Sequence, residues 1–556
     1  MAGADTDNPS PAGAGYVGGA AADSAARDSM IASLEGRPVG RVTIAPRNIY
    51  EPVPPGAIGH LFRIANRLHM RTRPSTIRAL LLFDEGDPWS DELGRETARL
   101  MRSLDFLYPQ RIEALPAGDS VEVLVETRDV WSTRLEFNLE SFAGRSYGSI
   151  ALNELNFLGF GKSVSLTYRE EPSGRADLDT IGAAPADGLR NAISRSFAFH
   201  DPNVMGSRLR LRTLSSTGTN GSSDQFFIGV PFYSEDAQRA FGLQYLREGA
   251  IVQLYQRSAV VAELDKRLQQ GELFYGFGAR REGVVERLEF SLFAMDRELG
   301  ATRLSEAASP GFIDDAESQQ VRRVAVEGRL WRPRFVERSY VNRLGFTEDF
   351  DVGSSFTMKL GFSPRAFGGT ASEGYAQMKL DAGAQAGAGF GWLRTSVSGR
   401  IRREPREVLA TVDAAWVHQP RPRQAWVFAA RGVSGSRMAH DFQTGVGGLT
   451  GLRAYPVRAV SGRRLWRFNA ESRLTVAHGY DDVLTIGWVG FADAARAWGT
   501  GSEGSTWHYS LGTGLRFNLP LWSQSRVLRV DVAWPISPTR DGKREPVFSF
   551  GSGQAF

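Results

Sequence analysis

The chain has 556 residues, of which 42% are hydrophobic and 23% charged, with a formal net charge of +4 and no cysteine. So small a positive excess over this length gives no reason to expect nucleic-acid binding. No run approaches the roughly 18 consecutive apolar residues of a membrane-spanning helix, so a helical membrane protein is excluded. A membrane β-barrel remains compatible with this composition, because its strands alternate apolar and polar residues.

The first 40 residues are rich in Ala, Gly, Ser and Asp. They contain no apolar stretch of the about 7–15 residues that form the centre of a secretory signal peptide. We expect residues 1–40 to be a disordered lead-in, because a segment of this composition has little apolar surface to bury.

Residues 41–130 predict a small unit of mixed α/β type. Pro74 is suited to the first turn of a helix, and Ser90 is a candidate N-cap for a later one. The expected elements are, in order, a strand at 41–50, a basic helix or turn insertion at 57–70, a helix at 75–83, a helix at about 90–103 and strands at 110–114 and 120–126.

From residue 131 onward, helical periodicity gives way to an alternation of apolar and polar residues. In residues 133–140, Leu135, Phe137 and Leu139 alternate with polar side chains, as in a strand with two different faces. The pattern recurs to the end of the chain, and no helical region is available to cover the apolar faces. A soluble antiparallel sheet also alternates, but an antiparallel barrel in lipid fits residues 131–556 better.

Tryptophan positions also favour a membrane barrel. Eleven of the twelve tryptophans lie after residue 130, and membrane barrels concentrate aromatic residues at the two interfaces. About twenty segments have a strand pattern, up to nine of them between residues 133 and 300.

The most specific stretch is Gly445-Val-Gly-Gly-Leu-Thr-Gly-Leu-Arg-Ala-Tyr455-Pro. It resembles the signature loop of the BamA/TamA superfamily, in which a glycine pair precedes V/I-R-G-F/Y. The positions that correspond to this loop motif are Gly447, Gly448, Leu452, Arg453, Ala454 and Tyr455. Ala454 replaces the usual glycine.

Three further segments resemble the same superfamily. Residues 491–495 (FADAA) are similar to its F-x-D-x-G motif, and residues 469–473 (NAESR) are similar to the E-x-R of the strand before it. Residues 153–161 (NELNFLGFG) are similar to its E-x-N-x-x-G-x-G hairpin. Alternation places the polar members of the first two motifs on the inner face. The lumenal partners expected for the loop are Glu471, Arg473, Phe491 and Asp493.

The resemblance implies an α+β POTRA domain at residues 41–130, followed by an all-β transmembrane antiparallel barrel of about sixteen strands. It also implies that the loop folds back into the lumen and brings Arg453 to Asp493 and Glu471, where a guanidinium and a carboxylate can pair in a bidentate manner. A general network of lumenal charges is the less specific alternative.

The end of the chain carries a second candidate signal. Phe548, Phe550 and Phe556 share one parity, and the sequence ends on the last of them. This resembles outer-membrane barrels, whose final strand is read by the assembly machinery.

No catalytic constellation is visible. Gly144, Ser146 and Gly148 fit the G-x-S-x-G motif of hydrolases, but that motif needs a helix after it, and here strands are expected on both sides. The seven histidines are scattered and cysteine is absent, so no metal site is expected. We therefore expect neither an enzyme nor a cofactor.

The first functional hypothesis is a bacterial outer-membrane factor that inserts or translocates other proteins. The POTRA domain would lie in the periplasm and receive unfolded outer-membrane clients, which would insert at the seam between the first and last barrel strands. Outer-membrane lipid and accessory lipoproteins are the other expected partners, and nucleic acid is not. The alternatives are a secretion pore dedicated to one partner protein, or a lipid or passive channel.

Overall fold

The computed structural model describes residues 30–53, 55–142, 145–172, 191–256, 259–304, 318–448, 451–479, 484–499, 506–518, 527–538 and 544–555. Residues 1–29 of the expected lead-in lie outside this part. Residues 30–40 correct that expectation, because residues 30–34 are helical and a strand begins at Val39. Leu34 is buried in the core of the domain that follows, which explains why this segment is ordered with it.

A small α+β domain precedes the barrel. Its elements are β1 (Val39–Arg47), α2 (Ala57–Leu68), α3 (Pro74–Arg78), α4 (Asp91–Arg102), β2 (Leu107–Ala117) and β3 (Ser120–Asp129). The strand order is β1-β3-β2, with β3 parallel to β1 and antiparallel to β2. Val121, Val123 and Val125 of the central strand are buried in the core.

The helices α3 and α4 begin where the sequence predicts. Pro74 is the first residue of α3. Ser90 occupies the N-cap of α4, although its side chain makes no capping hydrogen bond there. Acidic residues in the first turn of α4 and basic residues in its last turn complement the helix dipole. For residues 57–70 the sequence allowed either a basic helix or a turn insertion, and the structure has the helix α2 there.

Twenty strands of the described residues form one closed barrel. They are β4 (Thr133–Phe142), β5 (Arg145–Phe157), β6 (Lys162–Pro172), β7 (Asn191–Asp201), β8 (Arg210–Gly218), β9 (Gly221–Val230), β10 (Arg239–Gln256), β11 (Ala259–Arg281), β12 (Val284–Leu304), β13 (Gln319–Arg332), β16 (Ser354–Ser363), β17 (Glu373–Ala386), β18 (Gly389–Ile401), β19 (Pro405–Arg421), β20 (Gln424–Ser436), β23 (Arg464–Gly479), β24 (Leu484–Trp498), β25 (His508–Asn518), β26 (Leu528–Pro535) and β27 (Val547–Ser552). Each is antiparallel to its neighbours, and β27 pairs with β4 to close the wall.

The expectation of sixteen strands was wrong. The strands between residues 191 and 304 all belong to the wall. For example, β10 and β11 stay in register from Arg239 opposite Phe277 to Gln256 opposite Ala259. The local alternation was therefore the better guide to strand number than the count implied by the resemblance.

The outer face of the wall is apolar. Leu135, Phe137 and Leu139 on β4 are 57%, 38% and 49% exposed, whereas Arg134, on the opposite face, is only 4% exposed. Large apolar side chains are exposed in the same way on strands around the whole barrel. So large a band of exposed apolar surface is typical of a protein wall in contact with lipid. Among the helices of the described residues, none has the length and apolarity needed to span a bilayer.

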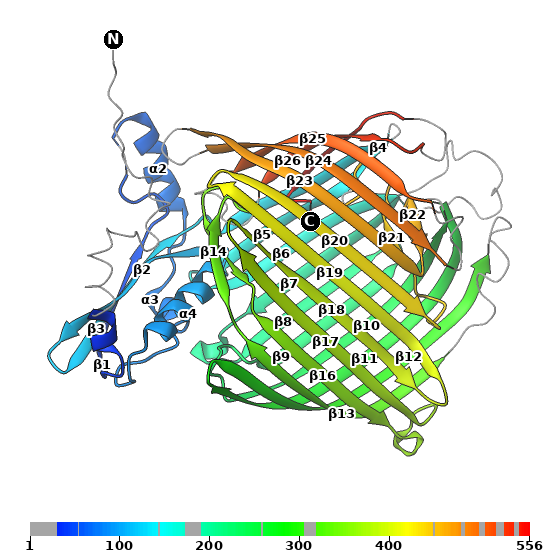
Figure 1. Cartoon of the computed structure of the whole chain (residues 1–556), viewed down its shortest axis with the longest axis horizontal. Helices are drawn as coiled ribbons and strands as arrows, with labels where there is room; N and C mark the ends of the chain where they lie inside the picture. Colours follow the sequence, from blue (N-terminus) through cyan, green and yellow to red (C-terminus); the bar gives the residue numbers. More distant parts are fainter. Residues whose placement is uncertain are drawn as a thin grey trace, which may run out of the picture.

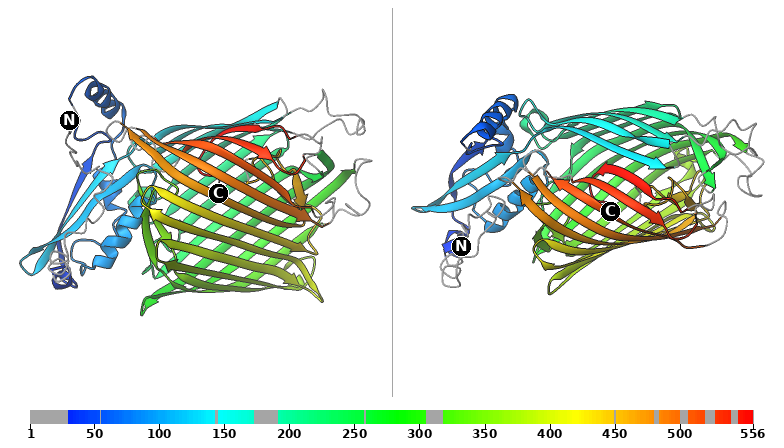
Figure 2. Two further views of the ribbon diagram at one scale, coloured as in Figure 1. Left: turned by 45° about the horizontal axis from the view of Figure 1, so that its top comes forward. Right: turned by 90° about the horizontal axis from the view of Figure 1, so that it is seen from above.

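Two short hairpins stand apart from the wall. One consists of β14 (Phe335–Ser339) and β15 (Thr347–Asp351), and the other of β21 (Thr444–Val446) and β22 (Val460–Gly462). The α+β domain lies at one open end of the barrel, and β14 is at that end (Figures 1 and 2). The strands β4 and β5 pair directly on either side of the G-x-S-x-G segment, whose Gly144 lies outside the described residues, so the helix of a nucleophile elbow does not follow.

Candidate functional site

The connection between β20 and β23, residues 437–463, carries the glycine-rich motif and is called the lumen loop below. Its hairpin β21–β22 ends at a turn that only glycine fits well. Gly447 and Gly448 have φ angles of 150° and 61°, and a Cβ on Gly447 would lie 2.0 Å from the carbonyl oxygen of Pro456. The N–H of Gly448 donates to the carbonyl of Tyr455 at 2.7 Å, which closes the turn.

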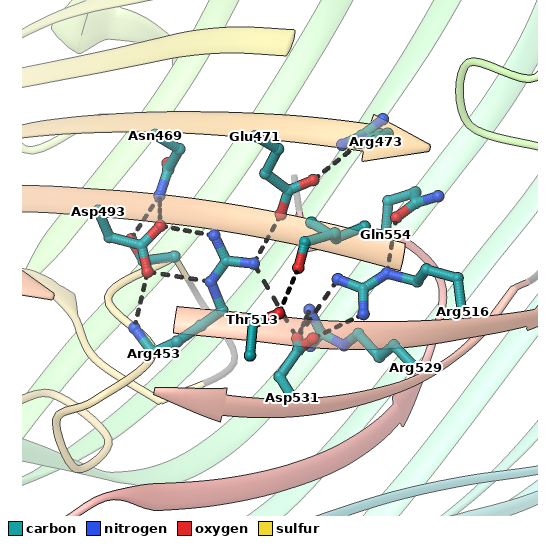
Figure 3. Close-up of polar contacts among 12 residues, drawn as sticks. Arg453, Asn469, Glu471, Arg473, Asp493, Thr513, Arg516, Arg529, Asp531 and Gln554 are labelled. Carbon is teal, nitrogen blue, oxygen red and sulfur yellow. Dashed lines mark hydrogen bonds and ion pairs between the residues drawn. The ribbon is translucent and has the colours of Figure 1, made fainter. Parts of the chain in front are cut away.

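Arg453 is the centre of the site. Its side chain is 1% exposed and meets two carboxylates from neighbouring strands. Nε and Nη2 donate to the two oxygens of Asp493 on β24, at 3.0 and 2.7 Å. Nη1 donates to Oε1 of Glu471 on β23 at 2.6 Å. The structure thus brings together the three residues that the loop motif predicted to meet (Figure 3).

Further contacts fix the guanidinium and its main partner in place. The ring of Phe491 lies under the guanidinium, 3.4 Å from the ring centroid to Cζ. Asn469 donates to Asp493 at 2.8 Å and to the carbonyl of Gly451 in the lumen loop at the same distance. A planar cation with bidentate partners and an aromatic face has one favoured orientation.

The charges of this cluster are deeply buried. Burial would lower the pKa of Arg453, but Asp493 and Glu471 outweigh it and hold that pKa above its ordinary value. The ion pair therefore stays charged. Removing Arg453 alone would leave a buried carboxylate without a cation. Such a change typically lowers the free energy of unfolding by about 3–5 kcal/mol.

Besides Arg473, which the E-x-R motif predicted, the network includes residues of β25 and β26 that no motif predicted. Arg473 donates to Oε2 of Glu471 at 2.8 Å, and Arg516 on β25 donates to Asp531 on β26 at 2.6 Å. Asp531 also lies 4.0 Å from Arg453. The sequence analysis did not predict Arg516, Arg529 and Asp531 as partners of the loop. The alternation of residues along β25 and β26 places these side chains on the polar face of the strands. It carries no signal that this face meets the loop.

The remaining loop residues anchor the tip. Leu452, Ala454 and Tyr455 are all buried in one apolar cluster with side chains of β23 and β24. The hydroxyl of Tyr455 donates to the carbonyl of Ser537 at 2.7 Å, just after β26. Ala454 is completely buried, so the side chain that replaces the usual glycine is accommodated by the packing.

The final strand lies where the sequence expected it. Phe548 is 58% exposed on the outer face, and Phe550 stacks on Phe137 of β4 with 5.2 Å between ring centroids. Phe556 lies outside the described residues. In the part of the chain that the structure describes, no group of three or more acidic or histidine side chains is placed to hold a metal ion.

Comparison with known proteins places this site in a family. Residues 428–556 match the Omp85 superfamily domain, and this range includes most of β20, the lumen loop and all strands from β23 to β27. No curated protein matches the sequence.

Among solved structures, BamA from Haemophilus ducreyi lacking POTRA domains 1-3 is similar to this chain at 12% identity and a TM-score of 0.38, over 92% of this chain and 84% of that chain. CdiB from Acinetobacter baumannii is similar at 10% identity and a TM-score of 0.44, over 94% and 74% of the two chains. CdiB from Escherichia coli is similar at 11% identity and a TM-score of 0.44, over 92% and 76%. Residues 428–556, which contain the whole Arg453 cluster, are therefore similar to the Omp85 superfamily domain and form part of a closed antiparallel β-barrel.

Proposed function

We propose that this chain inserts β-barrel proteins into the outer membrane at the seam between β27 and β4. The observation that carries the proposal is the shortness of this seam. In the described residues, three residue pairs join β27 to β4, from Phe548 opposite Ser141 to Phe550 opposite Leu139. By comparison, β4 and β5 are joined by ten pairs. Because each backbone hydrogen bond contributes on the order of 0.5–1.5 kcal/mol net, this is a seam that costs little to open.

The sequence of β27 accounts for its early end. The strand stops at Ser552, and Gly553 follows with a φ angle of 88°, which is outside the range of an extended strand. At this last residue, a side chain of β4 replaces backbone pairing, since Oδ1 of Asn138 accepts the N–H of Ser552 at 3.0 Å. An opened β4 would offer unpaired backbone groups to the strand of a client.

The α+β domain is proposed to be a POTRA domain that delivers clients. Its sheet order leaves β1 and β2 at the two edges, where a client strand could add. Of these, β2 contains Pro109 and Pro116, whereas β1 contains only Pro46. Proline cannot donate to a neighbouring strand, so β1 is the more suitable edge.

A disulfide across the seam tests the proposal. The chain has no cysteine, so Leu139→Cys with Phe550→Cys introduces a single pair at directly opposite positions, where Cα separations suit a disulfide. We expect the oxidised variant, reconstituted in liposomes, to lose insertion of a denatured client barrel, and a reductant to restore it.

The matched control locks a seam that is not expected to open. Leu515→Cys with Val530→Cys joins β25 to β26, again at opposite outward-facing positions. This variant should insert clients equally well when oxidised and reduced. Normal insertion by the oxidised β27–β4 variant would overturn the proposed route.

The range of clients separates this proposal from a dedicated secretion pore. Depletion of the protein in its own cells, followed by proteomics of the outer membrane, should lower many barrels together. Loss of one secreted or surface protein, with other barrels unchanged, would favour a pore that serves a single partner.

A further inference from the structure

Helix α2 presents one face that nothing in the described part of the chain covers. Leu61, Ile64 and Leu68 are three and four residues apart, so they lie on the same side of the helix. Leu61 is 65% exposed and Leu68 is 76% exposed, and Ile64 is exposed as well. These three residues are called the α2 apolar face below. Large apolar side chains that cluster on a surface mark a site of interaction.

The opposite side of α2 is fixed against the segment that precedes the helix. Phe62 stacks on Tyr50 with 3.8 Å between the ring centroids. The side chain of Asn66 accepts the N–H of Tyr50 at 3.1 Å and donates to the carbonyl of the same residue at 2.8 Å. Because these contacts set the rotation of the helix, the α2 apolar face is directed away from the rest of the domain.

The charges beside the α2 apolar face all have the same sign. Residues 57–73 contain four arginines and no Asp or Glu. Arg63 and Arg67 are one turn apart and exposed, and neither forms an ion pair with a carboxylate of the described residues. A short helix with an apolar face and a basic flank is typical of helices that lie in the surface of an anionic bilayer.

The C-terminal end of α2 is tied to the rim of the barrel. In the segment that follows the helix, Thr72 accepts a hydrogen bond from the side chain of Asn156 on β5 at 2.8 Å. The N–H of Arg73 donates to the carbonyl of Gly159, in the turn between β5 and β6, at 3.1 Å. The helix is therefore held at the end of the barrel where the α+β domain lies (Figures 1 and 2).

Exposed apolar side chains continue from the barrel wall to this helix. They lie on the outer face of β5 and β6, in the turn between these strands and at the end of α2: Leu152, Leu166, Phe157, Leu158, Phe160, Leu68 and Met70. The outer face of the wall has the character of a surface in contact with lipid. The α2 apolar face thus extends that surface at its edge, where acyl chains give way to headgroups.

We propose that α2 lies in the surface of the bilayer at this end of the barrel. Its apolar face would enter the boundary between headgroups and acyl chains, and Arg63 and Arg67 would bind anionic phospholipid headgroups. Such a contact holds the α+β domain in one orientation relative to the membrane. It requires that the barrel stands in a bilayer, but it does not rest on the insertion of client proteins.

A single fluorescent label on the full chain tests the proposal. The chain has no cysteine, so Leu61→Cys carries the one nitrobenzoxadiazole label of a protein held singly in a lipid nanodisc. The nanodiscs contain phosphatidylcholine with or without phosphatidylglycerol, and a nitroxide on the acyl chains quenches labels that enter the bilayer. We expect strong quenching in the discs with phosphatidylglycerol and weaker quenching in those without.

Two other label positions are the controls. Leu135→Cys places the label on the outer face of β4, so it should be quenched in both kinds of disc. Leu115→Cys places it at an exposed position of β2 in the same domain, close to the β2–β3 turn. This turn is at the end of the two strands away from the barrel (Figure 1), so the label should remain unquenched.

Arg63→Gln with Arg67→Gln tests the contribution of charge. The ratio of inserted to free helix in the phosphatidylglycerol discs should fall by about fivefold for each arginine lost. Glutamine is a good helix former, so the helix itself is retained. Arg95→Gln with Arg111→Gln removes two exposed arginines of the same domain outside α2, and this variant should leave the ratio unchanged.

Three results would overturn the proposal. The first is a label at position 61 that is quenched no more than the label at position 115. The second is quenching that responds neither to phosphatidylglycerol nor to the loss of both arginines of α2. The third is a shift of the emission to shorter wavelength without quenching, since a protein surface would then cover the α2 apolar face. No client protein enters these measurements, so their outcome is independent of the insertion assay.

Discussion

Arg453 and Arg516 are the two largest side chains among the described residues with less than 2% exposure. Charges so deep in a protein persist only when partners surround them. Arg453 belongs to the lumen loop, while Asp493 and Glu471 belong to the wall. The ion pairs therefore attach the loop to the inner face of the barrel. They hold the loop against the strands that lead to the seam.

The first residue-scale prediction is that Arg453→Ala destabilises the folded barrel by about 3–5 kcal/mol, because two buried carboxylates lose their cation. The measurement is the denaturant midpoint at which the barrel loses its folded mobility on a gel. Arg453→Lys should be intermediate, since lysine keeps the charge but not the bidentate geometry. Arg464→Ala, on an exposed arginine of β23, is the control and should change little. An unchanged midpoint for Arg453→Ala would contradict this role.

The β14–β15 hairpin connects three parts of the molecule at the scale of elements. On one side, Arg102 of α4 holds Asp349 with two hydrogen bonds, at 2.6 and 2.7 Å. On the other side, the hairpin loop gives its carbonyl groups to the barrel: Arg473 donates to Val341 at 3.0 Å, and Asn518 donates to Leu344 at 2.6 Å. The loop is therefore a direct physical link from the α+β domain to the Arg453 cluster.

Arg102→Ala tests this link. We expect faster hydrogen exchange in both α4 and the loop at 340–346, because breaking the ion pair frees the two sides of one contact. Exchange in β6 and β7, which contribute no residue to the apolar cluster of the hairpin, should stay the same. Arg95→Ala is the control on the same helix, since Arg95 is 61% exposed and, within the described residues, forms an ion pair with Asp91 alone, four residues before it. Faster exchange confined to α4 would argue against coupling.

At the scale of the whole molecule, the sequence predicted the two-part architecture but not the size of the barrel. The alternation of apolar and polar residues indicates which face of a strand meets lipid. It was sufficient to assign the two faces of β4 and β24. It does not report whether a hairpin such as β8–β9 joins the wall, since that depends on pairing with strands far away in the chain. The same limit applies to the site. The loop motif predicted Arg453 with Asp493, whereas the contact of Arg473 with Val341 is tertiary and has no sequence pattern.

The junction between domain and barrel should respond to pH through Glu96. This carboxyl faces Glu235 and Asp236 from the β9–β10 connection, with Arg99 on its own helix and Arg287 on the barrel wall. Burial is the main cause that raises the pKa of Glu96 from its ordinary value of 4.5 to about 7. A carboxyl whose pKa is raised by folding stabilises the folded form fully at pH values below its unfolded pKa. That stabilisation is lost as the pH rises through the folded pKa.

We therefore expect the attachment of α4 to weaken between about pH 4.5 and pH 7 and to change little above this window. Exchange rates of α4 amides, corrected for the intrinsic effect of pH, measure this directly. Glu96→Gln removes the titrating proton and keeps an acceptor for the N–H of Glu235, so it should flatten the dependence. A variant with the same dependence as the unmodified chain would assign the effect to another group. Because α4 also holds the β14–β15 hairpin through Arg102 and Asp349, this proton would weaken one of the contacts that join the domain to the barrel.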